Sequence, residues 1–220
     1  MNNLIKNPNN PPKIIFLIGM HRSGTSLLSN CLNENGFSIG KTKNQDKNWQ
    51  NPNGYFENDE FTKFHNKLLN HNNSRWDTIN KDKMSYSSND VIEYRNLIEK
   101  EFSDNKMGLI KDPRLSFFID FIYEVCRDRY EYYIIFCTRD KKECCTSLSK
   151  AQNIPYRKAE KLYNQTHSKY QDHFLKIDHN DSIYKNSEVL SRIAKFCDFE
   201  LKADTSNVVD LTLYRNRKDE

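Results

Sequence analysis

The sequence lacks the segments that would place a protein in or across a membrane. No window approaches 18 consecutive apolar residues, so no transmembrane span is expected. The N-terminal stretch, MNNLIKNPNNPP, has no apolar core of signal-peptide length, and we expect residues 1–12 to form a flexible lead. The chain also has no internal repeat and no sign of a second domain. Residues 13–220 are therefore predicted to form a single domain, long enough to bury a sizeable core.

Patterns typical of zinc sites and disulfide frameworks are missing as well. The six cysteines form no CxxC pair, and Cys31, Cys137 and Cys197 fall in apolar patterns typical of a core. We therefore expect six reduced thiols, no metal site and a cytoplasmic location. The net charge of +4 is mild. It suits an anionic small ligand but does not require nucleic acid.

The chain does contain an alternation of short apolar runs and amphipathic stretches. The runs are predicted strands at 14–18, 106–110, 132–138 and 173–177. Helices are predicted after Gly24 as far as Gly36, at 57–69, at 90–102 with Asn89 or Asp90 as its cap, from Pro113 to Val125, and at 141–149, 155–171 and 187–197. This alternation predicts a three-layer α/β/α fold with a central, mainly parallel sheet of about four to five strands. The glycine loop described below makes this fold resemble that of P-loop NTPases.

Three polar loops follow predicted strands, at 19–24, 111–114 and 139–140. Ligands of parallel sheets bind beyond the carboxyl ends of the strands. We therefore expect these loops to share one edge of the sheet and to form the binding site there.

The loop at 19–24 is a phosphate-binding candidate. Gly19, Gly24 and Ser26 match the spacing of the P-loop pattern G-x-x-x-x-G-K-[ST], but Thr25 stands at the lysine position. A positive charge is available instead from Arg22, whose guanidinium can hold two oxygens at once. A strand, a glycine loop and a helix in this order point backbone N–H groups at a phosphate. The alternative is an ordinary turn with incidental glycines.

The stretch IGMHRSGTSLL resembles the 5′-phosphosulfate-binding loop of sulfotransferases that use 3′-phosphoadenosine 5′-phosphosulfate (PAPS). It is especially similar to the R-S-G-T-[ST] form of tyrosylprotein sulfotransferases and many bacterial members. The resemblance implies that Arg22, Ser23, Gly24, Thr25 and Ser26 hold the 5′-phosphosulfate. It covers the first 60 residues and residues 105–150, and the stretch at 173–199 is similar to the strand and helix that end the family fold.

A second motif, YYIIFCTRDKKECCTSL, places Arg139 at a strand end and Ser147 eight residues later. About two turns of helix separate the two side chains, and a fold in the loop would bring both onto one phosphate. The motif resembles the segment of the family that binds the 3′-phosphate of PAPS, although Lys141 stands where the family usually has proline. The alternative is a solvated surface arginine.

The segments NPNGYFE and KDPR resemble stretches that flank the site in small bacterial sulfotransferases. Sulfuryl transfer needs a base for the proton of the acceptor and a cation for the leaving phosphate. By the resemblance, Glu57 is the first candidate for the base, with Glu60 and His65 in reserve, and Lys111 is a candidate cation. Each also has a structural interpretation, Glu57 as an exposed residue at a helix start and Lys111 as a solvated residue at a strand end.

Other polar residues are expected to have supporting or structural roles. Asp112 and Arg114 are expected to pair and to orient Lys111. His21 lies inside the phosphate loop, where it would either contact the ligand or stabilise the loop. The C-terminal Arg215, Arg217 and Lys218 are predicted to be a solvated tail, since the family's G-x-x-G-x-x-K pattern is missing.

The leading hypothesis is a sulfotransferase that moves the sulfuryl group of PAPS to a hydroxyl or amine of an acceptor, with 3′,5′-diphosphoadenosine (PAP) as the product and no metal. The acceptor is a small molecule, a glycan or a peptide. One alternative is a P-loop kinase that uses ATP–Mg²⁺, with Ser26 on the metal and Asp112 as an acidic ligand at a strand end. The other is a nucleotide-binding protein without catalytic activity.

Overall fold

A parallel sheet of four strands forms the centre of the protein. The computed structural model describes residues 12–41, 54–103, 107–205 and 208–209. Its strands are β1 (Lys13–Gly19), β2 (Met107–Lys111), β3 (Glu131–Thr138) and β4 (Leu175–Asp178), in the order β2-β1-β3-β4. Every pairing between them is parallel. The predicted α/β fold is confirmed, and the sheet has four strands.

Strand β1 lies in the middle of this sheet because both of its faces are apolar. Ile14, Phe16 and Ile18 face one hydrophobic cluster, whereas Ile15 and Leu17 face another. All five are fully buried. This is the alternation that a strand covered on both sides requires.

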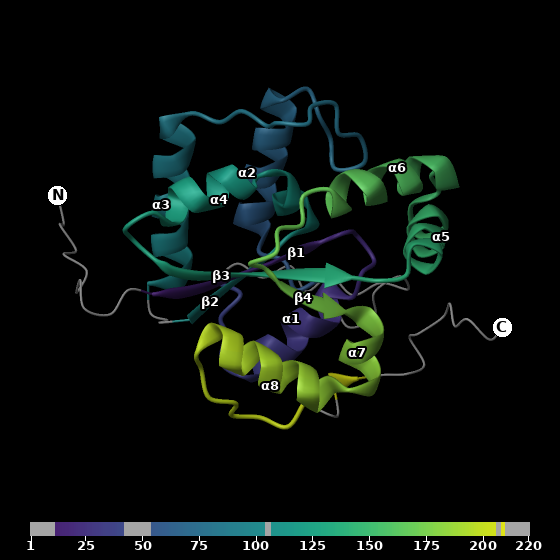
Figure 1. Cartoon of the computed structure of the whole chain (residues 1–220). Coiled ribbons are helices and arrows are strands. Elements are labelled where there is room, and N and C mark those ends of the chain that lie inside the picture. Colours follow the sequence, from purple (N-terminus) through teal and green to yellow (C-terminus); the bar gives the residue numbers. More distant parts are fainter. Residues whose placement is uncertain (1–11, 42–53, 104–106, 206–207, 210–220) are drawn as a thin grey trace.

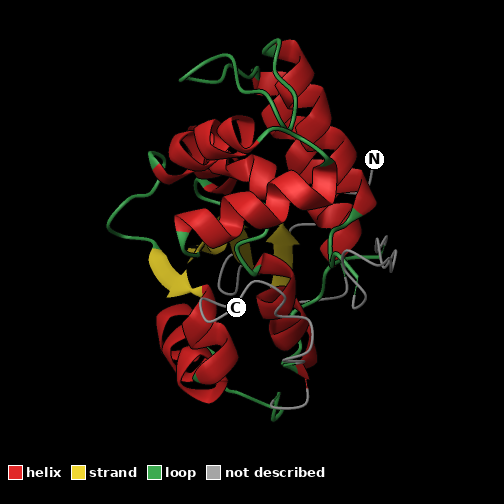
Figure 2. Ribbon diagram, turned by 90° about the vertical axis from the view of Figure 1, so that its right-hand side faces the viewer, coloured by secondary structure: helices red, strands yellow, loops and turns green. Residues whose placement is uncertain are grey.

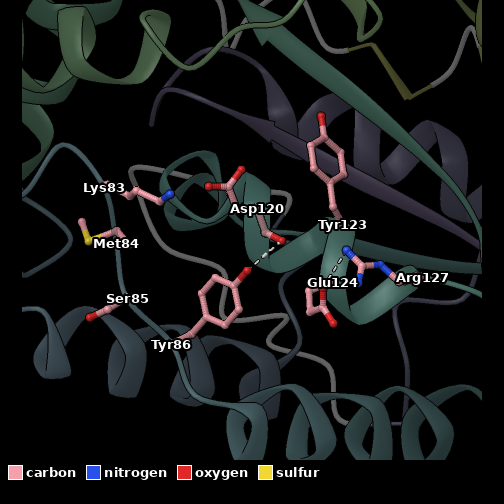
Figure 3. Close-up of a pocket in the computed structure, with 8 residues that line it drawn as sticks. All are labelled: Lys83, Met84, Ser85, Tyr86, Asp120, Tyr123, Glu124 and Arg127. Carbon is pink, nitrogen blue, oxygen red and sulfur yellow. Dashed lines mark hydrogen bonds and ion pairs between the residues drawn. The ribbon is translucent and has the colours of Figure 1, made fainter.

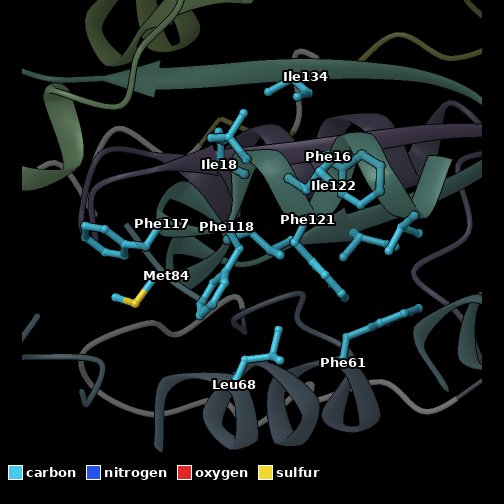
Figure 4. Packing of buried hydrophobic residues seen from close by; sticks show 14 of the residues in the cluster. Phe16, Ile18, Phe61, Leu68, Met84, Phe117, Phe118, Phe121, Ile122 and Ile134 are labelled. Atoms are coloured by element: carbon cyan, nitrogen blue, oxygen red, sulfur yellow. The ribbon is translucent and has the colours of Figure 1, made fainter. Parts of the chain in front are cut away.

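Helices cover the two faces of the sheet (Figures 1 and 2). One cluster contains residues of α2 to α6, and Figure 4 shows Phe121 and Ile122 of α4 packed beside Phe16 of β1. The other cluster contains residues of α1 and α8. The helices are α1 (Thr25–Glu34), α2 (Asp59–His71), α3 (Ser88–Phe102), α4 (Ile119–Cys126), α5 (Lys141–Gln152), α6 (Tyr156–His167), α7 (His179–Tyr184) and α8 (Asn186–Cys197).

The segment after Pro113 differs from the single helix that the sequence predicts. Pro113–Phe117 forms a 3₁₀ helix, η1, and α4 starts separately at Ile119. Phe118 breaks the two apart, with φ −123° and ψ 39°. Its side chain is buried, so packing of the aromatic residues overrides the continuous helical pattern.

Other boundaries differ from the prediction as well, the largest shift being that of α6, which ends at His167 and not at residue 171. The cap of α3 is Ser87, whose Oγ accepts from the N–H of Asp90 while the Asp90 carboxylate accepts from the N–H of Ser87. Asp90 is therefore the third helical residue of a capping box. Strand β4 begins two residues later than predicted and ends one residue later, and the short helix α7 follows it directly, capped by Asp178.

Several predictions fall on other parts of the chain. Residues 1–11 of the N-terminal lead, residues 42–53, and Arg215, Arg217 and Lys218 lie outside the described residues. All six cysteines are described, and each is buried and free of disulfides. No described helix combines the length and the apolar character needed to cross a membrane.

Candidate active site

The phosphate-loop candidate connects the buried end of β1 to the start of α1. The Ser23 N–H and hydroxyl both donate to the carbonyl of Met20, at 3.2 and 2.7 Å, and so close the turn. Arg22 and Gly24 have positive φ values of 71° and 92°. Helix α1 starts at Thr25 with no side-chain cap at Gly24. The N-terminus of α1 therefore lies at the carboxyl edge of the sheet, directly after the loop, and the helix macrodipole favours an anion there.

The three predicted loops share this edge, as the sheet register shows. Gly19 of β1 lies opposite Cys137 of β3, and Leu17 lies opposite Lys111 of β2. The Gly19 N–H donates to the hydroxyl of Ser116 in η1 at 3.0 Å. The end of β1 is therefore fixed to η1, the segment that follows β2.

One group of side chains joins Lys111 to Glu57. The Lys111 ammonium lies 2.6 Å from Oε1 of Glu57, and it also donates to the carbonyl of Tyr55 at 3.1 Å and to Oγ of Ser26 at 3.4 Å. Lys111 is 5% exposed. The loop at 54–57 is thus brought to the phosphate loop, although more than 50 residues separate Glu57 from Lys111 in the chain.

A second group joins the phosphate loop to the segment after β3. Nε of Arg22 donates to Oγ of Ser147 at 3.1 Å. Nη1 of Arg139 donates to the carbonyl of Arg22 at 3.2 Å, and its Nε donates to Glu143 at 3.2 Å. Arg139 and Ser147 are each 8% exposed. Two guanidinium groups and a hydroxyl therefore gather at one place, as a ligand with a doubly charged phosphate requires.

The two reserve candidates for the base, His65 and Glu60, do not contact Lys111 in the way that Glu57 does. His65 is fully buried, with Nδ1 2.7 Å from Asp112 and Nε2 2.9 Å from the hydroxyl of Tyr94. Glu60 lies on the outer side of α2, 2.8 Å from the ammonium of Lys63. Neither contacts the phosphate loop in these hydrogen bonds, whereas Glu57 is joined to it through Lys111.

Asp112 and Arg114 pair, as the sequence analysis expects. Nη1 of Arg114 lies 2.9 and 3.1 Å from the two carboxylate oxygens of Asp112 and 3.7 Å from Oε2 of Glu57. Burial opposes ionisation of Asp112, but the charges of Arg114 and His65 hold its pKa well below the usual range. Since both of its oxygens are occupied, Asp112 has the contacts of an orienting group and not those of an open metal ligand.

Two histidines lie at the phosphate loop, and one of them, His179, was not predicted from the sequence. His21 is inside the loop, and its ring lies edge-on to Trp76 with centroids 5.2 Å apart. His179 directly follows β4, and its Nδ1 occupies the space that a Cβ on Gly24 would need. The signal that could have found His179 is its place after a predicted strand, at the same sheet edge as the other loops.

Both of these histidines are neutral at physiological pH. Burial lowers the pKa of His21 to about 3, and the charges of Arg114, Lys111 and Arg22 add to the effect while Asp112 opposes it. The pKa of His179 is also lowered to about 3, mainly by burial and in part by the positive charges of Arg139 and Arg22. A site built from so many cations excludes a further positive charge.

We predict that these histidines make the protein sensitive to mild acid. Their pKa is 6.5 when unperturbed, so between pH 6.5 and 3 the unfolded chain binds more protons than the folded one. Stability should therefore fall as the pH drops from 7 to 5. The His21→Asn variant should show a smaller difference in melting temperature between these pH values than the native protein. The control is His71→Asn, at an exposed position at the end of α2; an equal effect of both variants would contradict the assignment.

We also predict that Gly24 cannot be replaced by alanine without a large loss of stability. The left-handed φ of 92° and the contact with His179 together should cost about 3 kcal/mol in the free energy of unfolding. Urea unfolding of Gly24→Ala and of Gly24→Ala/His179→Ala separates the two causes. The second variant should recover the part due to the contact and retain the part due to φ. No recovery would show that His179 does not crowd this position.

A cavity of about 440 Å³ lies elsewhere, between the segment 83–86 and α4. Figure 3 shows Tyr86 reaching across it to Asp120, where its hydroxyl donates to the carbonyl at 3.2 Å. Its lining residues are Lys83, Met84, Ser85, Tyr86, Asp120, Tyr123, Glu124 and Arg127. None of the candidate site residues is among them. The candidate site at the sheet edge is therefore assigned from the chemistry of its side chains and not from this cavity.

The described residues contain no group of three or more His, Cys, Asp or Glu side chains placed to hold a metal ion. Charge at the candidate site comes from Arg22, Lys111, Arg114 and Arg139 instead.

Comparisons with known proteins point to one family. A sequence model described as "Sulfotransferase family" matches residues 12–203. No curated protein matches the chain by sequence. Among solved structures, the sulfotransferase domain of the Synechococcus PCC 7002 olefin synthase is similar with a TM-score of 0.54 and 14% identity, covering 94% of this chain and 84% of that one.

Two other solved structures have a similar fold. Sulfotransferase STF9 from Mycobacterium avium matches with a TM-score of 0.54 and 14% identity, over 98% of this chain and 70% of that one. The sulfotransferase domain from the curacin biosynthetic pathway matches with a TM-score of 0.53 and 14% identity, over 94% and 80%. At this identity the structural matches show the shared fold, and the family model carries the assignment.

Proposed function

The chain belongs to the sulfotransferase family and is a transferase, and we propose that its sulfuryl donor is PAPS. The observation that carries the proposal is the 3.1 Å hydrogen bond between Nε of Arg22 and Oγ of Ser147. It joins two segments that resemble the 5′-phosphosulfate and 3′-phosphate sites of the family. PAPS has anionic groups at both positions, whereas ATP has none at its 3′ position.

In this proposal each segment holds one end of the donor. Arg22, Ser23, Gly24, Thr25 and Ser26, at the N-terminus of α1, hold the 5′-phosphosulfate through backbone N–H groups, hydroxyls and the guanidinium. Arg139 and Ser147 hold the 3′-phosphate. The carbonyl of Arg22 accepts from Arg139, so the two parts of the donor site are braced against each other.

Glu57, Lys111 and Arg22 are proposed as the catalytic residues. Glu57 accepts the proton of the acceptor hydroxyl or amine while the attacking atom forms a bond to sulfur and the bond from sulfur to the bridging oxygen breaks. Lys111 and Arg22 stabilise the negative charge that the leaving 5′-phosphate gains, and PAP is released. In this scheme side-chain cations supply the charge stabilisation that Mg²⁺ supplies in kinases.

The kinase alternative has less support. It requires Asp112 to bind Mg²⁺, but this carboxylate is 1% exposed and already accepts from Arg114 and His65. The kinase alternative also assigns no ligand group to the pair of Arg22 and Ser147, because ATP has no 3′-phosphate. The buried free thiols further support a reducing compartment such as the cytoplasm, and we propose a small molecule, a glycan or a peptide as the acceptor.

Transfer to a pool of candidate acceptors tests this function. The purified protein is incubated with PAPS and with mixtures of phenols, sugars and peptides, and products are detected by mass spectrometry. We expect an added sulfo group on at least one acceptor, together with release of PAP. Phosphoryl transfer from ATP–Mg²⁺ to the same pool, with no sulfo transfer, would overturn the proposal.

A further inference from the structure

The ammonium of Lys111 has no N–H group left for a ligand. An ammonium has three N–H donors. Those of Lys111 are directed at Oε1 of Glu57, the carbonyl of Tyr55 and the hydroxyl of Ser26, at 2.6, 3.1 and 3.4 Å. With 3% of its side chain exposed, Lys111 has little contact with water. A sulfuryl donor that binds to this ammonium must therefore displace one of these three partners.

Glu57 is constrained by the same contact. Its Oε1 accepts from Lys111 at 2.6 Å, and its Oε2 lies 3.7 Å from Nη1 of Arg114. The side chain is 13% exposed. A base must be within hydrogen-bond reach of the proton that it accepts, with a lone pair directed at it. The shortest contact of Glu57 instead directs a lone pair at Lys111.

Ser26 places this ion pair next to the proposed donor site. The hydroxyl of Ser26 contacts Lys111, and Ser26 itself is part of the loop that resembles the 5′-phosphosulfate site. A sulfonate bound there lies beside the same ammonium as Glu57. Two anionic groups then compete for one cation in a site that water hardly reaches, where such contacts are strong.

We propose that the Glu57–Lys111 ion pair keeps the base inactive until the donor binds. The proposal rests on the proposed function, since it takes PAPS as the donor and Glu57 as the base. Binding of PAPS transfers Lys111 from the carboxylate to the phosphosulfate, and Glu57 becomes available to the acceptor. The donor must then bind before the acceptor can react.

Arg114 keeps the carboxylate in place when Lys111 leaves. Its Nη1 is fixed by both oxygens of Asp112, which also accepts from His65. The ring of His65 is held on its other side by Tyr94. This buried chain of contacts is independent of Lys111, so Glu57 retains one cationic neighbour and does not need to move.

The affinity for PAPS of the Glu57→Gln variant tests the proposal by calorimetry without acceptor. Glutamine has nearly the same shape but no charge, so Lys111 leaves it more easily. We expect PAPS to bind about tenfold more tightly than to the native protein. The matched control is Glu60→Gln, in the first turn of α2, whose carboxylate pairs with Lys63 and not with Lys111; this variant should bind PAPS as the native protein does. Unchanged or weaker binding to Glu57→Gln would overturn the proposal.

A second pair of variants shows whether Lys111 is the cause. In the Lys111→Met background, Glu57→Gln should no longer tighten PAPS binding, because there is no ammonium to release. An equal gain in both backgrounds would show that the carboxylate only repels the anionic donor, and would overturn the role of the ion pair. Failure of the native protein to bind PAPS would instead refute the proposed function itself. Circular dichroism establishes that each variant is folded.

Discussion

Replacement of Glu57 by glutamine should lower the rate of sulfuryl transfer by about 10²- to 10⁴-fold, the usual effect of losing a general base. Glutamine cannot accept the proton of the acceptor. Because the donor site does not depend on the proton, PAPS should still bind. The rate is measured in single turnovers with PAPS bound and with an acceptor identified by mass spectrometry, so that binding and chemistry are separated.

The same measurement on Glu60→Gln and His65→Gln distinguishes the three candidate bases. Glu60→Gln should retain the native rate, because its carboxylate pairs with Lys63 on the surface. His65→Gln should lower both stability and rate through Asp112 and Arg114, but by less than Glu57→Gln. A native rate for Glu57→Gln, with a large loss for Glu60→Gln, would show that the base was assigned to the wrong residue.

Replacement of Arg139 by alanine should weaken the binding of PAP by about 10- to 100-fold. Binding of adenosine 5′-phosphate, which has no 3′-phosphate, should change much less. The difference arises because the guanidinium of Arg139, which donates to the carbonyl of Arg22 while the Arg22 side chain contacts Ser147, is proposed to hold the 3′-phosphate. Calorimetric titration of both ligands into both proteins gives the four affinities.

Lys141→Ala is the control for this experiment. Lys141 starts α5 two residues after Arg139, but its ammonium pairs with Glu160 at 2.9 Å and is substantially exposed. It should bind both ligands as the native protein does. Equal losses of PAP and adenosine 5′-phosphate in Arg139→Ala would mean that the arginine supports the loop through the carbonyl of Arg22 and does not select the 3′-phosphate.

The strands and their shared edge could be predicted from the sequence because burial on both faces leaves a strong pattern. The apolar runs of β1 and β3 are continuous, and a parallel sheet places all of its strand ends at one edge. The residues at those ends therefore converge whatever lies between them. This is why the loops that contain Arg22, Lys111 and Arg139, far apart in the chain, meet at one edge of the sheet.

Details that depend on packing could not be predicted in the same way. The break at Phe118 and the short helix α7 follow from the fit of side chains against the sheet, which no local pattern records. His179 contacts the phosphate loop because β4 lies beside β3, a pairing of distant segments. The ion pair of Glu57 with Lys111 has the same origin. Its two residues were each singled out by motif, but their contact is a property of the fold.

The surroundings of His21 favour a role in stabilising the phosphate loop. The neutral ring packs against Trp76 between the phosphate loop and the segment at 74–80, and its pKa of about 3 keeps it uncharged among the cations of the site. The ring therefore adds no charge to the site at neutral pH. The Cys144 thiol donates to its carbonyl at 3.2 Å, which also fixes the backbone of the loop.

Ligand-dependent thermal stability tests the identity of the donor most directly, because it needs no acceptor. The melting temperature is measured with PAP and, separately, with ATP–Mg²⁺ at the same concentration. We predict that PAP raises it by several degrees at a concentration of about 100 times its dissociation constant, and that ATP–Mg²⁺ has a smaller effect. Stabilisation by ATP–Mg²⁺ with none by PAP would contradict the assignment of this site to PAPS.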